Sequence, residues 1–112
     1  MQFRYGEVEG IWLVCTPEMD LDASNSDEFK KTAAPLVQGR SRVVMDLSGI
    51  GFMDSAGLGA ILSIFKKVRA DGGQFRVFGL SEEVKALFEL VRMQRLFEVY
   101  SDKESALAAS RS

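Results

Sequence analysis

Residues 42–70 read RVVMDLSGIGFMDSAGLGAILSIFKKVRA, and this stretch decides the fold. The apolar run Val43-Val44-Met45 predicts a buried strand, and the glycines near residue 50 predict a turn. After residue 57, apolar residues recur at the three- and four-residue spacing of a helix that packs on a sheet: Leu58, Ile61, Leu62, Phe65 and Val68. The stretch therefore predicts a strand followed by an amphipathic helix, which ends at Asp71-Gly72-Gly73.

Strands and helices alternate on both sides of this stretch. Residues 3–8 and 11–15 are apolar runs separated by Glu9-Gly10, and they predict a hairpin. Cap-forming residues at 22–25 predict a helix that runs toward Gln38, in which Pro35 should cause a kink or an early end. Beyond residue 73 we expect a strand at 75–78, a helix capped by Ser81, a strand at 96–100, and a last helix that begins with a capping box at 101–104 and runs through Ala109.

This order of elements predicts an α/β domain. Single helices between strands imply parallel crossovers, and hence a mixed, mostly parallel sheet of about five strands with about four helices packed mainly on one face. A chain of 112 residues fits one domain, which we assign to residues 1–112 with a core from about 3 to 109.

Composition excludes several classes of function. Fourteen basic against 16 acidic residues give a net charge of -2, so direct binding to nucleic acid is not expected. Histidine is absent, which removes the usual catalytic base and the commonest metal ligand, and Cys15 has no second cysteine to pair with. No apolar run approaches the ~20 residues that span a bilayer. We expect a cytoplasmic protein that is not an enzyme, uses no cofactor or metal and does not insert into a membrane.

Ser55 is the candidate functional residue. It follows Asp54 at or just after the N-cap of the predicted helix, where unpaired backbone N–H groups and the helix dipole favour negative charge. A phosphate there adds a charge of about -1.5 to -2, and beside Asp54 it would turn a nearly neutral surface into a strongly negative one. The alternative is that Asp54 and Ser55 only cap the helix, as both residue types commonly do.

A run of small side chains accompanies Ser55. Helical spacing places Ala56, Gly59, Ala60 and Ser63 opposite the apolar stripe, which predicts a flat, exposed face that another protein can approach closely. The competing interpretation is that small residues are merely tolerated on a solvated face. Glycine near a helix start costs up to about 1 kcal/mol, and this cost favours the docking interpretation.

Residues 43–48 and 52–59 together closely resemble the signature of STAS domains, specifically the bacterial anti-anti-sigma factors, also called anti-sigma factor antagonists. Leu21-Asp22 with Asn25, the pair Gly72-Gly73, and residues 84–96 extend the similarity over most of the chain. Met19 departs from the pattern, because many members have glycine there. This departure concerns the docking loop, and hence the choice of partner, more than the fold.

The resemblance implies a partner switch. The unphosphorylated chain, a monomer when free, would bind an anti-sigma factor that is also a serine kinase and so release a sigma factor. Phosphorylation of Ser55 would reverse the binding, and a phosphatase of the PP2C type would restore it. The expected partner-binding residues are Asp22, Asn25, Asp54, Ser55, Ala56, Gly57, Gly59, Ala60 and Ser63. Asp22 can equally serve only to cap the first helix.

Three other functions compete with this one. A STAS domain can also be a soluble subunit that regulates a lipid or anion transporter. An enzyme with Ser55 as nucleophile would lack a histidine or a nearby lysine as its base. A phosphoaspartate receiver built on Asp46 would lack an acidic pair after the first strand to bind magnesium. We expect the partner switch because it accounts for the Asp-Ser-x-Gly sequence.

Overall fold

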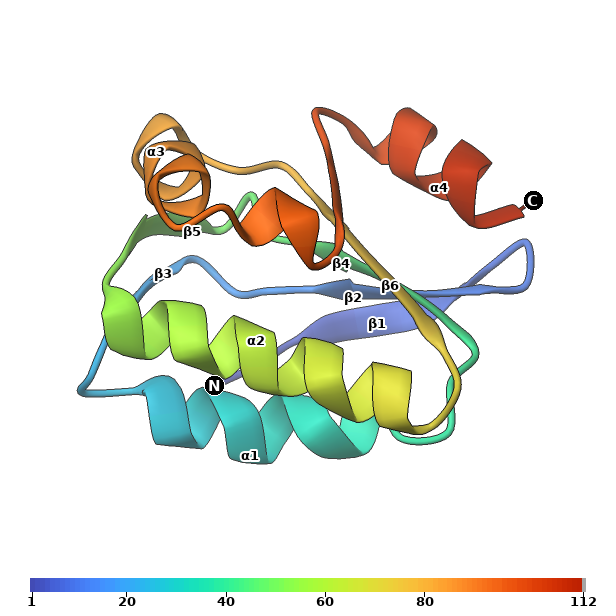
Figure 1. Cartoon of the computed structure of the whole chain (residues 1–112). Helices are drawn as coiled ribbons and strands as arrows, with labels where there is room; N and C mark the ends of the chain where they lie inside the picture. The colour runs from blue at the N-terminus through green and yellow to red at the C-terminus, as the bar shows by residue number, and fades with distance from the viewer. Residues whose placement is uncertain (112) are drawn as a thin grey trace.

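The protein contains a five-stranded sheet with helices on both faces (Figure 1). The computed structural model describes residues 1–111. The strands are β1 (Arg4–Val8), β2 (Ile11–Cys15), β3 (Met19–Leu21), β4 (Arg42–Asp46), β5 (Ile50–Met53), β6 (Gln74–Phe78) and β7 (Glu98–Tyr100). The helices are α1 (Ser26–Val37), α2 (Ser55–Ala70), α3 (Glu82–Leu90), the 3-10 turn η1 (Met93–Arg95) and α4 (Lys103–Arg111).

The main sheet has the order β1-β2-β4-β6-β7. Only β1 and β2 are antiparallel, and the other neighbouring pairs are parallel, so the predicted mixed, mostly parallel sheet is confirmed. The predicted hairpin is also confirmed. Glu9 and Gly10 both have positive φ, 54° and 81°, the conformation of a two-residue turn whose twist matches that of the flanking strands.

Alternate residues of the strands face two separate apolar clusters. Val14, Val43 and Val77 lie in the larger cluster, which α1 and α2 cover together with α3 and η1. Val44 and Phe78 face the other way and pack with Ala106 and Leu107 of α4. The prediction that the helices pack mainly on one face is therefore confirmed, and α4 is the helix that covers the opposite face (Figure 1).

β3 and β5, which were not predicted from the sequence, form a separate two-stranded parallel sheet. The glycines near residue 50 predicted only a turn, and no element was predicted at residues 17–20, because strands this short carry little periodic signal. The two segments lie very close, since a Cβ on Gly49 would be 2.5 Å from the Pro17 carbonyl oxygen. The Met19 N–H donates to the Gly49 carbonyl at 2.9 Å. This pairing brings the residues after β3 next to those after β5.

Two helix ends differ from the prediction. α1 continues to Val37, so an early end at Pro35 was wrong, and the exposed proline lies in its last turn, where few residues follow it. α4 is capped by Asp102 rather than by Ser101, because the Asp102 carboxylate accepts the Ser105 N–H at 2.8 Å. The capping box predicted at 101–104 is therefore wrong, and a single side-chain cap one residue further on begins the helix.

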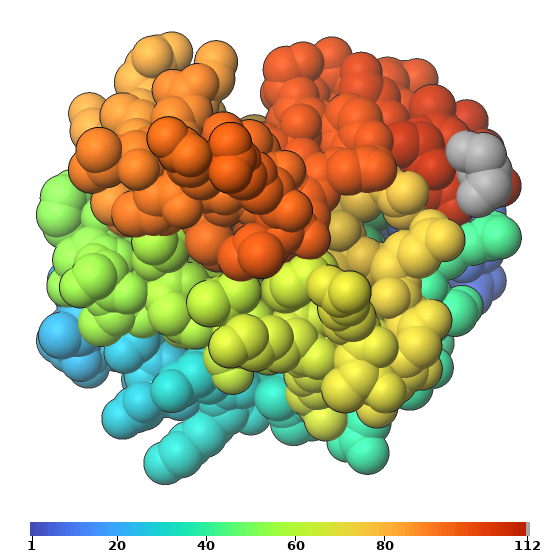
Figure 2. Space-filling model, in the orientation of Figure 1, coloured from blue at the N-terminus to red at the C-terminus, as the bar shows by residue number. Residues whose placement is uncertain are grey.

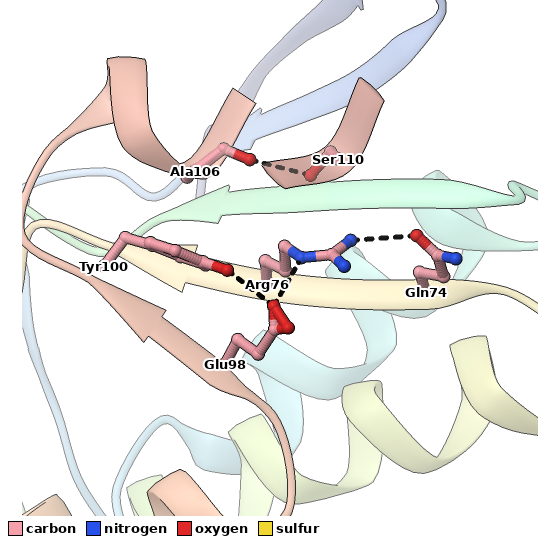
Figure 3. Close-up of polar contacts among 6 residues, drawn as sticks. All are labelled: Gln74, Arg76, Glu98, Tyr100, Ala106 and Ser110. Atoms are coloured by element: carbon pink, nitrogen blue, oxygen red, sulfur yellow. Dashed lines mark hydrogen bonds and ion pairs between the residues drawn. The ribbon is translucent and has the colours of Figure 1, made fainter. Parts of the chain in front are cut away.

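The short strand β7 is held to β6 by side chains as well as by backbone pairing (Figure 3). Arg76 Nε donates to Glu98 Oε1 at 2.9 Å, and the Tyr100 hydroxyl donates to the same oxygen at 2.5 Å. These donors keep the pKa of Glu98 below its usual value, the Tyr100 hydroxyl being the larger cause. The network lies far along the chain from Ser55 and fixes the edge of the sheet.

Candidate functional site

The site forms where β3 and β5 end side by side. The Asp54 N–H donates to the Leu21 carbonyl at 3.3 Å, so the residues that follow the two strands are joined. A Cβ on Gly57 would lie 2.3 Å from the same carbonyl oxygen. Gly57 therefore lets the chain at Leu21 approach the first turn of α2 more closely than any other residue would allow.

Asp54 is the N-cap of α2 and also a bridge to the preceding loop. Its Oδ1 accepts the Gly57 N–H at 2.9 Å, as an N-cap carboxylate does. Its Oδ2 accepts the Ala23 N–H at 3.1 Å, 31 residues away in sequence. One carboxylate thus links the start of α2 to the residues before α1.

Residues 22–25, here called the 22–25 loop, are also ordered by hydrogen bonds of their own. Asn25 Oδ1 accepts the Asp22 N–H at 2.9 Å, and Asn25 Nδ2 donates to the Asp20 carbonyl at 2.8 Å. Asp22 Oδ1 accepts the Ser24 N–H at 2.9 Å and the Ser24 hydroxyl at 2.5 Å. The Asp22 side chain shapes this loop and does not cap α1 directly. Asn25 occupies the N-cap position, but its side chain makes no cap hydrogen bond.

Ser55 is the first residue of α2, and its side chain is exposed. The predicted position, at the N-cap or one residue beyond it, is confirmed. Asp54 caps the helix, so the competing interpretation of Ser55 as a cap is not needed to explain how α2 begins. Among residues 1–111, no side chain or backbone group forms a hydrogen bond with the Ser55 hydroxyl. The hydroxyl is therefore accessible to a reacting group from solvent.

The predicted small-residue face is partly wrong. Gly59 and Ser63 are exposed and Ala56 is half-buried, but Ala60 is only 1% exposed. Gly57, which was expected among the partner-binding residues, is also buried. α2 packs against α1 as well as the sheet, and Ala60 belongs to the same cluster as Ala33 of α1. This second neighbour rotates the buried side of α2 toward Ala60, so that Leu58 and Leu62 are only partly buried. The exposed side of α2 lies between α1 and the η1 region (Figure 2).

Two acidic residues, Asp54 and Asp22, belong to the segments that meet at the site. The Asp54 carboxylate accepts the Ala23 N–H, and Ala23 directly follows Asp22 in the chain. The pKa of Asp54 lies below its usual value, mainly because the Gly57 N–H donates to the carboxylate and next because the Ala23 N–H does. Asp54 is therefore ionised at neutral pH. Within residues 1–111, no group of three His, Cys, Asp or Glu side chains is arranged to hold a metal ion.

The effect of Asp54 on stability should depend on pH. A carboxyl group whose pKa is depressed in the folded state contributes stability above its unfolded pKa, which is about 4. That contribution is lost as the pH falls through the lower folded value. Asp54→Ala should therefore lower the free energy of unfolding at pH 7, and the difference from wild type should shrink below pH ~4. Urea unfolding at pH 7, 4 and 3 measures it, and a difference that grows on acidification would contradict this assignment.

Two features of the site had no clear signal in the sequence. Phe52 directly precedes the site on β5, and 49% of its surface is exposed, although large aromatic side chains are more often buried. Ala23 contributes only its backbone N–H group to the site, so its residue type gives no indication of this role.

For the residues 1–111 described by the structure, no helix is both long and apolar enough to cross a membrane.

Known proteins resemble this chain in sequence and in structure. It is 27% identical over 110 residues to BtrV of Bordetella bronchiseptica, which is assigned as an anti-sigma factor antagonist; the match covers 97% of this chain and 94% of that protein. It is 30% identical over 82 residues to the anti-sigma-B factor antagonist of Listeria monocytogenes, covering 71% of each.

A solved structure from Planctomyces limnophilus, described as an anti-sigma-factor antagonist (STAS) domain protein, shares the fold. The TM-score is 0.85 at 21% identity, and the alignment covers 98% of each chain. The STAS domain family itself matches residues 3–106, which include every strand of both sheets and the whole site around Ser55. The chain therefore belongs to the STAS domain family.

Proposed function

We propose that this chain is an anti-sigma factor antagonist whose partner binding is switched by phosphorylation of Ser55. The observation that carries the proposal is the exposed Ser55 hydroxyl on the first residue of α2, left without a capping role by Asp54. The names of the relatives support the same function, because both the Bordetella and the Listeria proteins are described as antagonists of anti-sigma factors. They do not support the transporter-subunit alternative.

The partner is an anti-sigma factor with serine kinase activity. In the unphosphorylated state the chain binds this partner and the sigma factor is released. The kinase transfers the γ-phosphoryl group of ATP to Ser55 Oγ, with ADP and the hydroxyl proton as the other products. A PP2C-type phosphatase hydrolyses the phosphate ester with water and restores the serine. The chain is not an enzyme in this cycle; it acts in the cytoplasm, as a monomer when free, and through protein contacts alone.

The docking surface consists of the exposed groups around Ser55. It includes the half-buried Asp22 and Asp54, the exposed side of α2 at Gly59 and Ser63, and the exposed aromatic ring of Phe52. Exposed aromatic side chains often provide much of the binding energy in an interface. Three of the expected partner-binding residues support this surface from below. Gly57 and Ala60 are buried, and Asn25 is half-buried. Ala56, which is half-buried, borders it.

The proposal is tested by reconstitution with the cognate anti-sigma factor and its sigma factor. Unphosphorylated chain added to the preformed complex should bind the anti-sigma factor and displace the sigma factor, as measured by size-exclusion chromatography. Addition of ATP should return the sigma factor to the complex within the turnover time of the kinase. If the sigma factor stays bound at saturating concentrations of the chain, the proposed function is wrong.

The docking surface on α2 predicts the effect of two lysine substitutions. Gly59→Lys and Ser63→Lys place a long side chain on the exposed side of α2, where a Cβ on Gly59 meets no atom within 4 Å. We expect each variant to bind the anti-sigma factor about tenfold or more weakly while its melting temperature stays within a few degrees of wild type. Ala108→Lys on exposed α4, on the other face of the sheet, is the matched control and should bind normally. If all three variants bind the anti-sigma factor with the affinity of wild type, the exposed side of α2 is not part of the interface.

A further inference from the structure

Asp54 holds together two parts of the docking surface that come from distant segments of the chain. We propose that Asp54 is a positioning residue that fastens the 22–25 loop to the start of α2, and that phosphate on Ser55 releases this loop. The inference rests on the proposed function, in that Ser55 is the phosphorylated residue. Phosphorylation of Ser55 would then change the position of the 22–25 loop as well as the charge of the docking surface.

The connection between the two segments depends on few groups. Asp54 Oδ1 accepts the Gly57 N–H at 2.9 Å and Oδ2 accepts the Ala23 N–H at 3.1 Å. The Asp54 N–H donates to the Leu21 carbonyl at a longer 3.3 Å. The Asp22 side chain, which lies between Leu21 and Ala23, bonds only within its own loop, to Ser24. The Ala23 bond is therefore the only side-chain bond from Asp54 to the loop among residues 1–111.

A phosphate on Ser55 acts directly on this carboxylate. The two groups are on adjacent residues, and both carry negative charge at neutral pH, because the N–H donors keep the pKa of Asp54 low. Both also compete for the unpaired N–H groups in the first turn of α2, which is where an anion is most favourably held. The Gly57 N–H can donate to a phosphate oxygen in place of Asp54 Oδ1. The Ala23 N–H belongs to the other segment and loses its partner if the Asp54 carboxylate moves away.

The loop can move without being unfolded. Its internal bonds, from the Ser24 N–H to Asp22 and from the Asp22 N–H to Asn25, do not involve Asp54. Loss of the Ala23 bond therefore removes the side-chain link between the loop and α2, while the bonds within the loop and the Asp54 N–H bond to Leu21 remain. In the phosphorylated protein Asp22 would no longer be held in line with the start of α2, so one modification would alter both parts of the docking surface.

The proposal is tested by hydrogen exchange of single backbone amides, measured by NMR on the full chain. Phosphoserine is incorporated at position 55 during synthesis, so neither kinase nor partner is needed. We expect exchange at the Ala23 amide to become about tenfold faster or more, while Ser24 and Gly57 change by less than about twofold. Asp54→Asn keeps one carbonyl oxygen for Gly57 but can place its NH₂ group at Ala23. It should raise Ala23 exchange by a similar factor, and phosphoserine 55 should add nothing further in that variant.

Phosphoserine at Ser63 is the matched control. Ser63 is exposed on the same helix, about two turns beyond Ser55, so the same charge there should leave Ala23 exchange unchanged. The proposal is overturned if phosphoserine 55 leaves Ala23 exchange unaltered, if phosphoserine 63 has the same effect, or if phosphoserine 55 still accelerates exchange in Asp54→Asn.

These outcomes are separable from failure of the proposed function. Loss of partner binding on phosphorylation with unaltered Ala23 exchange would refute the role of Asp54 and leave the phosphorylation switch in place. A kinase that modifies a residue other than Ser55 would refute the proposed function, whatever the Ala23 amide does.

Discussion

Ser55→Asp is expected to weaken binding to the anti-sigma factor by about 100-fold or more, while Ser55→Ala binds within about threefold of wild type. The exposed Ser55 side chain lies at the centre of the proposed docking surface, between the 22–25 loop and the exposed side of α2. An unpaired charge buried in an interface costs several kcal/mol, and 100-fold corresponds to about 2.7 kcal/mol. Alanine removes only a small hydroxyl, for which the free protein shows no hydrogen-bond partner among residues 1–111.

The comparison is made by isothermal titration calorimetry with the purified partner. Circular dichroism and thermal melts establish that both variants are folded, which we expect because the side chain at position 55 makes no contact that the fold needs. Ala108→Asp carries the same charge on α4, on the other face of the sheet, and separates a local effect at position 55 from a general effect of net charge. Equal affinity of wild type and Ser55→Asp would contradict the assignment of Ser55 as the switch.

Gly57→Ala is expected to destabilise the protein by roughly 1–3 kcal/mol, the cost of an extra methyl group in a tightly packed region. Helix propensity alone would make alanine stabilising at this position. The packing opposes it, because the new Cβ would lie 2.3 Å from the Leu21 carbonyl oxygen and 2.9 Å from its carbonyl carbon. Backbone atoms cannot rotate away as a flexible side chain can, so the start of α2 and the chain at Leu21 would have to separate.

Gly59→Ala is the matched control for this substitution. Gly59 occupies the same helix, but a Cβ there meets nothing within 4 Å, so alanine should stabilise the protein by up to about 1 kcal/mol. We expect the melting temperature to fall by about 10 °C in Gly57→Ala and to rise by a few degrees in Gly59→Ala, as measured by differential scanning calorimetry. A rise in both variants would mean that the close approach at Leu21 is not rigid.

The sequence was most informative where local chemistry determines the structure. Glu9-Gly10 could be recognised as a tight turn, and the stripe from Leu58 to Val68 as a helix, because both patterns depend only on residues near in sequence. Ser55 could be placed at the start of α2 for the same reason.

What could not be predicted depends on distant neighbours. β3 and β5 pair through segments of three and four residues, which are too short for a periodic pattern to identify them as strands. The burial of Ala60 depends on α1 packing along α2, which adds Ala60 to the buried side of the helix and leaves Leu58 and Leu62 only partly buried. The bond from the Ala23 N–H to Asp54 spans 31 residues and uses a backbone group, so no residue type signals it.

The most direct test of the account is to locate the phosphate after incubation of the chain with its cognate anti-sigma kinase and ATP, by mass spectrometry of proteolytic fragments. The account predicts a single phosphate, on Ser55, and none on Ser55→Ala treated in the same way. Phosphate on another residue of the wild-type chain, or undiminished phosphorylation of Ser55→Ala, would contradict it.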